Sequence, residues 1–73
     1  MRVYHICYLM SCYGLEREID VIAKSKADAY DKAVFEEIPK VEGDHYPYGA
    51  YVESVTYNNG NRKVFNTIIG DPY

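Results

Sequence analysis

The dipeptide Asn59-Gly60 constrains the fold of this 73-residue chain more than any other short feature of its sequence. Asn and Gly tolerate positive φ angles, and Asn-Gly is typical of the type I′ turn that joins two antiparallel strands. The segments on either side, 50–57 and 62–69, contain many β-branched and aromatic residues. The sequence therefore predicts a hairpin over these two segments.

The two-residue turn also sets the register of the hairpin, and the register decides which side chains share a face. Tyr57 is expected to oppose Arg62, and Val55 to oppose Val64. One face is expected to join the core, and it carries Tyr51, Val55, Val64 and Ile68. The other face carries an outward stripe for a protein partner or a second copy of the chain, formed by Val52, Phe65 and Ile69.

The N-terminal part of the chain predicts a second hairpin. Residues 3–10 are almost all apolar and include no Gly or Pro, which favours a strand that is central in its sheet. Residues 15–23 alternate between apolar and charged side chains, as a half-exposed strand does. The residues between these segments, 11–14, end in a glycine and are expected to form the turn.

A helix is predicted to begin after Ser25, whose hydroxyl can accept a hydrogen bond from the backbone N–H of Asp28. Pro39 is expected to end this helix, because the residue before a proline avoids the helical region. Residues 40–49 then form the one long loop. One apolar stripe at helical spacing is expected to pack on the sheet, formed by Ala27, Tyr30, Ala33, Val34 and Ile38.

These elements follow one another as ββαββ. The sequence therefore predicts an α+β fold, with a four-stranded, mainly antiparallel sheet and one helix packed on one face. A chain of 73 residues is expected to form a single domain, residues 1–73. A chain this short buries only about 60% of its unfolded surface, so a homodimer that covers the open sheet face is physically attractive.

Charge and motifs argue against several classes of function. Eleven Asp and Glu against eight Lys and Arg give a net charge of -3, which disfavours nucleic acid as the partner, because phosphate-binding domains carry a basic excess. No segment has the roughly 20 apolar residues of a membrane helix, and the chain does not begin like a signal peptide. We therefore expect a cytoplasmic protein that does not bind membranes. The five glycines form no phosphate-binding motif.

Two histidines and two cysteines are the obvious candidates for a metal or catalytic site. His5 and Cys7 share a face of the first strand, because they are two residues apart. Cys12 stands at neither a redox nor a zinc-knuckle spacing from Cys7, and the fourth ligand would be His45, far along the chain. The sequence therefore predicts no metal, no cofactor and no enzymatic activity, with Cys7 packed as a small hydrophobe.

The long loop and the end of the helix carry the candidate partner-binding residues. Tyrosine offers rigid, amphipathic contact area, and carboxylates can face basic groups of a partner. Alternatively, the loop rings complete the small core and the acids form a solvated face. The candidate residues are Tyr46, Tyr48, Tyr51, Glu36, Glu37, Glu42 and Asp44.

The run from Ala23 to Ala33, AKSKADAYDKA, resembles small proteins of phages and integrative mobile elements of Gram-positive bacteria, as do the segments Tyr57-Asn58-Asn59-Gly60-Asn61 and Phe65-Asn66-Thr67. The resemblance implies a genomic setting, and no residue's role carries over from it. In that setting we expect a non-enzymatic protein-binding accessory protein, such as an acidic inhibitor of a host defence nuclease of the anti-CRISPR or anti-restriction type. The alternative is a small-ligand or single-stranded nucleic-acid binder that uses a tyrosine-bearing sheet.

Overall fold

A computed structural model of the chain describes residues 1–11 and 14–65. Along the chain these form β1 (Arg2–Leu9), β2 (Glu16–Ala23), a helical segment, β3 (Gly49–Thr56) and β4 (Arg62–Val64). The helical segment has three parts, α1 (Lys26–Lys32), the π-helical η1 (Ala33–Glu37) and α2 (Ile38–Glu42). None of the helices in these described ranges is long and apolar enough to cross a membrane.

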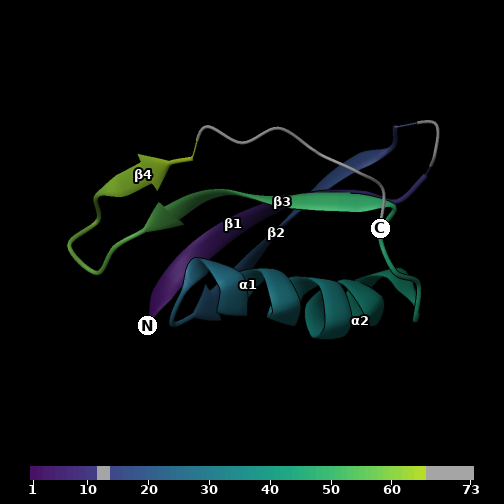
Figure 1. The fold of residues 1–73 in the computed structure, drawn as a ribbon, viewed down its shortest axis with the longest axis horizontal. Helices are drawn as coiled ribbons and strands as arrows, with labels where there is room; N and C mark the ends of the chain where they lie inside the picture. Colours follow the sequence, from purple (N-terminus) through teal and green to yellow (C-terminus); the bar gives the residue numbers. More distant parts are fainter. Residues whose placement is uncertain (12–13, 66–73) are drawn as a thin grey trace.

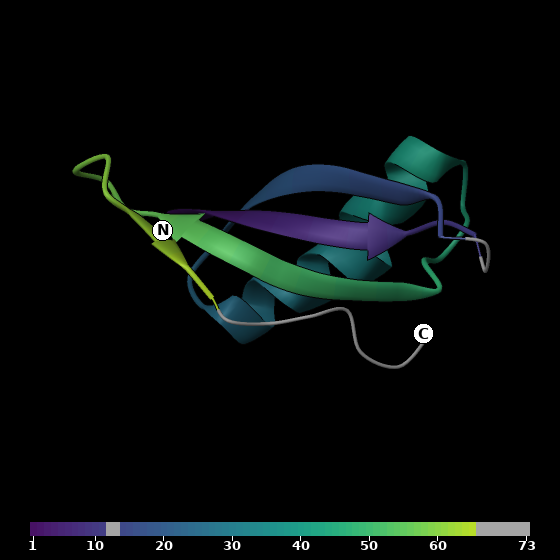
Figure 2. The same cartoon turned by 90° about the horizontal axis from the view of Figure 1, so that it is seen from above.

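The four strands form one antiparallel sheet in the order β2-β1-β3-β4. The helical segment lies across one face of this sheet (Figure 1), and the view from above shows it running beneath the strands (Figure 2). The predicted α+β class and ββαββ order are therefore confirmed. β1 pairs with a strand on each side, which confirms its predicted central position. The face of the sheet turned away from the helical segment is the open face.

Alternate side chains of β1 form the centre of the core. Tyr4, Ile6 and Tyr8 are buried between the sheet and the helical segment. Their core neighbours are small or branched residues of the adjoining elements: Val21, Ala23, Ala29, Ala33, Ile38, Val52 and Val55. The alanines leave room for the tyrosine rings, because protein interiors are close-packed and a small side chain on one side accommodates a large one on the other.

The helical segment begins as predicted and ends later than predicted. The hydroxyl of Ser25 accepts a hydrogen bond from the Asp28 N–H at 3.1 Å. Pro39 does not end the helix, because the π-helical turn before it places it in the first turn of α2, where a missing N–H costs little. The helix ends at Gly43, which is left-handed with φ of 73° and donates its N–H to the Pro39 carbonyl.

The π-helical turn also explains the error in the predicted apolar stripe. A π-helical turn inserts one extra residue and so rotates the faces of α1 and α2 relative to each other. A stripe drawn with a single helical period therefore accumulates an error along the segment, and here the error falls at its N-terminal end. Ala33, Val34 and Ile38 are buried and Tyr30 is half-buried, as predicted, whereas Ala27 is exposed. Ala29 is the buried residue of α1.

β3 contains one residue more than its pairing with β1 requires. His5 pairs with Ser54, but Ile6 pairs with Val52, so Glu53 is the extra residue of a β-bulge. On either side of the bulge, Val52 and Val55 both face the core. The predicted outward position of Val52 is therefore wrong. Tyr51, predicted in the core, instead pairs with Cys7 and shares its place on the open face.

The β3–β4 hairpin is present, and its turn differs from the predicted type. Gly60 donates its N–H to the Tyr57 carbonyl, and Tyr57 donates its own to the Asn61 carbonyl. A type I′ turn needs positive φ at Asn59 as well as at Gly60. Among the described non-glycine residues only Asp44 has a positive φ, so Gly60 alone is left-handed in this turn. The hydrogen bond from Tyr57 to Asn61 and the pairing of Thr56 with Arg62 leave a loop of three residues, 58–60.

The three-residue loop shifts the predicted register by one position, and Ser54 now pairs with Val64. A shift of one residue moves the β4 side chains to the opposite faces. Val64, predicted in the core, is 62% exposed, and Phe65, predicted outward, packs against the core. The predicted outward stripe thus loses both of its described members. Ile68 and Ile69 lie outside the described residues.

The bulge and the shifted register predict unequal effects of two matched valine substitutions. Val52→Ala is expected to lower the free energy of unfolding by about 2 kcal/mol, because it removes two methyl groups from a packed core. Val64→Ala is expected to change it by less than about 0.5 kcal/mol, because that side chain is exposed. Urea denaturation followed by circular dichroism measures both. A larger loss for Val64→Ala would instead support the two-residue register.

Candidate functional site

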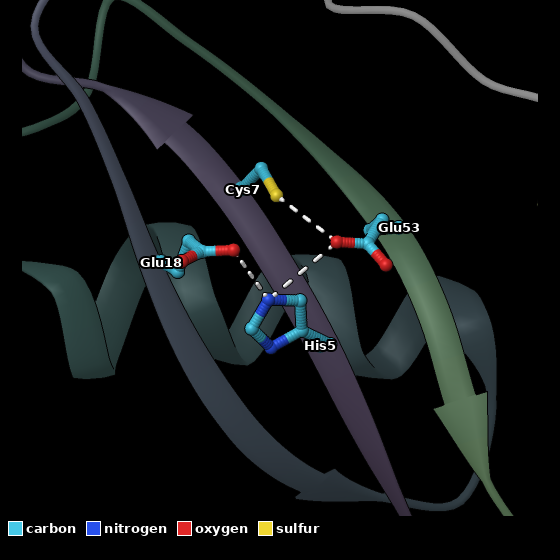
Figure 3. A group of neighbouring side chains, drawn as sticks. All are labelled: His5, Cys7, Glu18 and Glu53. Atoms are coloured by element: carbon cyan, nitrogen blue, oxygen red, sulfur yellow. Dashed lines mark hydrogen bonds and ion pairs between the residues drawn. The ribbon is translucent and has the colours of Figure 1, made fainter. Parts of the chain in front are cut away.

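Three neighbouring strands place polar side chains side by side on the open face (Figure 3). In the antiparallel register, Asp20 of β2 lies opposite His5 of β1, and Glu18 lies opposite Cys7. The bulge in β3 brings Glu53 to the same place, where its carboxylate contacts both His5 and Cys7. These five residues are named the polar cluster.

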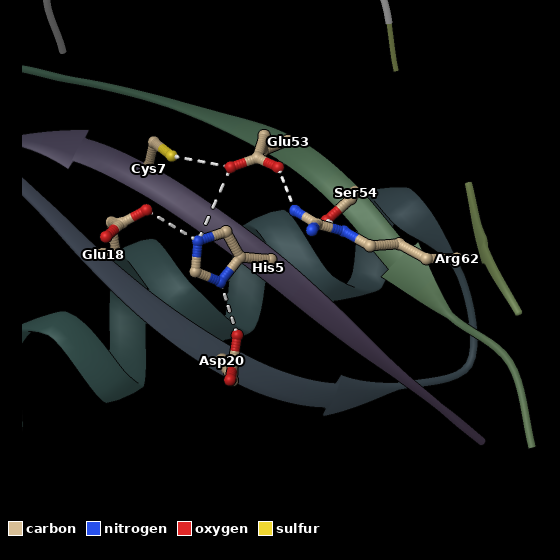
Figure 4. Close-up of polar contacts among 7 residues, drawn as sticks. All are labelled: His5, Cys7, Glu18, Asp20, Glu53, Ser54 and Arg62. Atoms are coloured by element: carbon tan, nitrogen blue, oxygen red, sulfur yellow. Dashed lines mark hydrogen bonds and ion pairs between the residues drawn. The ribbon is translucent and has the colours of Figure 1, made fainter. Parts of the chain in front are cut away.

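His5 contacts carboxylates at both ring nitrogens (Figure 4). Its Nδ1 lies 2.6 Å from Asp20 Oδ1 and its Nε2 lies 2.9 Å from Glu18 Oε1. The same Nε2 is 3.6 Å from Glu53 Oε2. The hydrogen bond with Asp20 raises the pKa of His5 most, the one with Glu18 raises it further, and burial opposes them. The cluster therefore favours a positive charge at its centre.

Arg62 of β4 holds the bulge residue in place. Its guanidinium donates a hydrogen bond to Glu53 Oε1. Its Nε donates a second one, 3.0 Å long, to the buried hydroxyl of Ser54. The other oxygen of the carboxylate, Glu53 Oε2, lies 3.6 Å from Cys7 Sγ. One oxygen of Glu53 is thus fixed by Arg62, and the other points into the polar cluster (Figure 4).

Cys7 is 2% exposed although it lies on the open face. Burial is the largest cause that raises the pKa of its thiol, whereas a hydrogen bond with Tyr51 lowers it and the charges of Glu53 and Glu18 raise it. The same contact with Cys7 is the largest cause that raises the pKa of Tyr51 to about 12. Cys7 is therefore a buried, protonated thiol whose sulfur faces a carboxylate.

Four of the five residues of the polar cluster bring possible metal-ligating atoms close together. One ligand atom from each of His5, Cys7, Glu18 and Glu53 lies within 4.8 Å of the others. A hollow of about 400 Å³ on the open face is lined by His5, Glu18 and Glu53, among other residues. The sequence predicts that His5 and Cys7 share a face of the first strand, but it does not place either glutamate beside them. Glu18 follows from the register of the first hairpin, whereas Glu53 depends on a bulge that no sequence motif signals.

A second surface lies where the predicted tyrosine loop meets the helix. Tyr46 packs edge-on against Phe35, with ring centroids 6.3 Å apart. Tyr46 and Tyr48 line a hollow of about 420 Å³ together with Leu15. These four side chains are between 47% and 58% exposed, and together they are named the aromatic end. Tyr51, predicted as a third partner-binding tyrosine, lies on the open face instead.

The four predicted acidic residues differ in their contacts and exposure. Glu42 accepts a hydrogen bond from the buried Tyr8 hydroxyl at 2.9 Å, and its side chain is only 12% exposed. Glu37 Oε2 is 3.8 Å from the ammonium of Lys40. Glu36 and Asp44 are exposed. Glu42 therefore has a structural role, because its carboxylate satisfies a core tyrosine.

Burial and this hydrogen bond also change the chemistry of Tyr8. Burial is the largest cause that raises its pKa to about 12, and the hydrogen bond and negative charge of Glu42 raise it further. Arg17 Nε, 3.6 Å from Glu42 Oε2, opposes this shift. The Tyr8 hydroxyl therefore keeps its proton and remains the donor to Glu42.

Comparison of the chain with known protein families, with curated proteins and with solved structures found no match. The resemblance to proteins of phages and mobile elements stays a prediction. The candidate sites are therefore the two surfaces that the geometry itself assembles, the polar cluster and the aromatic end.

The bond between Tyr8 and Glu42 predicts a stability effect that a surface carboxylate would not have. Glu42→Ala is expected to lower the free energy of unfolding by about 2 kcal/mol, because it leaves the buried hydroxyl without an acceptor. Glu42→Gln keeps an acceptor oxygen and is expected to cost less. Glu36→Ala, on an exposed position, is the control and is expected to cost less than about 0.5 kcal/mol. Equal urea midpoints for Glu42→Ala and Glu36→Ala would contradict the structural role.

Proposed function

We propose that this chain is a non-enzymatic protein-binding accessory protein that contacts its partner through the aromatic end. The observation that supports the proposal is the exposure of its four large side chains, between 47% and 58%, at one continuous place. Exposed apolar patches of this kind are typical of interaction sites. Tyr and Phe are also enriched at the centres of protein interfaces.

The surroundings of the aromatic end suggest how a partner is recognised. Arg17 and His45 line the same hollow as Tyr46 and Tyr48, so polar groups border the rings. A polar rim around a dehydrated aromatic centre is the usual anatomy of a protein interface. Tyrosine hydroxyls can also keep hydrogen bonds at such a border, because one end of the ring stays wet.

A narrower form of the proposal is that the partner is a host defence nuclease, of the kind used in restriction or CRISPR systems. The net charge of -3 and the exposed carboxylates Glu36 and Asp44 suit a partner whose binding site is basic. The resemblance to proteins of phages and mobile elements supplies the setting. Because Glu42 is tied to Tyr8, this form of the proposal uses Glu36 and Asp44 and leaves Glu42 out.

The structure weighs against the alternative that a tyrosine-bearing sheet binds single-stranded nucleic acid. Base stacking needs exposed rings, and Tyr4 and Tyr8 are buried beneath the helical segment. Tyr51 lies on the open face but is half-buried. The open face carries carboxylates where a nucleic-acid site would carry Lys and Arg, because Glu18, Asp20 and Glu53 all contact His5. These observations favour a protein partner.

A photo-crosslinking amino acid placed at position 46 tests protein binding without knowledge of the partner. Expressed in a Gram-positive host, this variant is expected to give a discrete covalent adduct with a second protein after irradiation. The same amino acid at position 64, an equally exposed place on β4, is the matched control and is expected to give none. No adduct from position 46, or the same adducts from both positions, would contradict binding through the aromatic end.

The nuclease form of the proposal is tested by plasmid survival in a host with an active restriction or CRISPR nuclease. The chain is expected to protect a targeted plasmid, and Tyr46→Ser combined with Tyr48→Ser to reduce protection at least about tenfold, because aromatic anchors dominate interface energies. Val64→Ser is the control that keeps protection. If the natural chain protects against neither nuclease type, the proposal of a nuclease partner is wrong. If the chain binds a single-stranded oligonucleotide at moderate salt, the broader proposal of a protein-binding accessory protein is wrong.

A further inference from the structure

We propose that His5, Cys7, Glu18 and Glu53 bind a divalent transition-metal ion of the zinc class on the open face of the sheet. Their ligand atoms already lie within 4.8 Å of one another (Figure 3). They come from three adjacent strands, so a bound ion would join β2, β1 and β3. The proposal is independent of the aromatic end and of any partner there.

The separations between these ligand atoms are close to those of a tetrahedral zinc site. Zinc bonds of about 2.0–2.3 Å place neighbouring donor atoms about 3.3–3.8 Å apart. His5 Nε2 is 2.9 Å from Glu18 Oε1 and 3.6 Å from Glu53 Oε2. Cys7 Sγ is 3.6 Å from the same Glu53 oxygen. The donor atoms therefore lie close to the spacing that a tetrahedral ion requires.

Asp20 prepares the imidazole for metal binding. Its Oδ1 lies 2.6 Å from His5 Nδ1, so the proton of a neutral imidazole is held on Nδ1. The lone pair of Nε2 then points toward Glu18 and Glu53 (Figure 4). Metal-ligating histidines almost always donate their second N–H in this way, and the partner is commonly a carboxylate.

Arg62 performs the equivalent task for the bulge glutamate. It holds Glu53 Oε1, which leaves Oε2 directed at Cys7 and His5. Ser54 in turn fixes the guanidinium through its hydroxyl. Outer hydrogen bonds of this kind orient metal ligands and are part of functional metal sites. Both the histidine and one of the carboxylates are therefore oriented before an ion binds.

The charge of the cluster favours a cation. Glu18, Asp20 and Glu53 carry three negative charges, and Arg62, in contact with Glu53, carries one positive charge. A divalent ion would bind neutral His5 and the thiolate of Cys7, so it would displace a proton from each side chain. The site without the ion would then carry three negative charges, and the ion would reduce them to one.

The donor set indicates which ion binds. Imidazole and thiolate ligands favour zinc and its neighbours over calcium and magnesium, which prefer oxygen ligands only. Four protein ligands also fill a tetrahedral site and leave no position for a substrate, as in structural zinc sites. The expected role is to connect three strands of a small domain, since small folds commonly depend on a metal or another crosslink.

Cobalt(II) titration of the chelator-treated, full-length chain tests the site with a spectroscopic signal of its own. Tetrahedral cobalt bound to a thiolate is expected to give visible d–d bands and a thiolate-to-cobalt charge-transfer band, at one ion per chain, and zinc is expected to displace it. Cys7→Ser is expected to abolish the charge-transfer band. Cys12→Ser, whose position lies outside the described residues, is expected to keep it.

Carboxylate variants decide between a metal site and an ion-pair network. Glu18→Gln is expected to weaken cobalt and zinc binding at least about tenfold, because it removes a ligand. Asp20→Asn is expected to weaken binding about 10- to 100-fold, because Asp20 orients the His5 ring. Glu16→Gln, on the same strand but outside the cluster, is the matched control and is expected to bind normally. Circular dichroism checks that each variant is folded. Glu18→Gln is expected to fold normally, because the Glu18 side chain is exposed. No charge-transfer band in the natural chain, or an unchanged band in Cys7→Ser, would overturn the proposal.

Discussion

The alternation of side chains along β1 is the constraint on which the rest of the structure depends. β1 is hydrogen-bonded to a strand on each side, so it cannot rotate about its own axis within the sheet. Successive side chains of a strand point to opposite faces. Burial of Tyr4, Ile6 and Tyr8 therefore obliges His5 and Cys7 to face the other way. A slip of one residue would place an imidazole and a thiol under the helical segment and three core side chains in water. Packing of the hydrophobic core on one face of β1 thus determines that His5 and Cys7 lie on the open face.

The two candidate surfaces have different physical supports. The polar cluster is built on paired strands, whose backbone hydrogen bonds hold side chains at defined separations. The aromatic end is built on the helical segment and the loops, where binding residues commonly lie. Tyr8 links the two regions, because its ring is in the core while its hydroxyl bonds Glu42 at the end of α2. Through this bond the core positions the start of the loop that carries Tyr46.

Local chemistry predicted the elements well and their registers less well. The Ser25 cap, the β-branched strands and the position of Gly60 each act within a few residues, so the sequence reveals them directly. The bulge at Glu53 and the π-helical turn before Pro39 each insert a single residue. Packing against distant parts of the chain stabilises these insertions, so no local sequence pattern predicts them. The bulge moves the side chains beyond it to the other face of the sheet, and the π-helical turn rotates the apolar face of the helix. For that reason Val52 was misplaced and Glu53 was missed as a member of the candidate site.

The position of β2 at the border of the sheet gives its carboxylates a second consequence. The outer backbone groups of β2 pair with no strand in the described part of the chain, and such borders are where sheets of separate molecules join. Two copies that approached through β2 would bring Glu16, Glu18 and Asp20 of each beside those of the other. Mutual repulsion would then keep the molecules apart in solution. The acidic residues of β2 would therefore oppose edge-to-edge association of two copies.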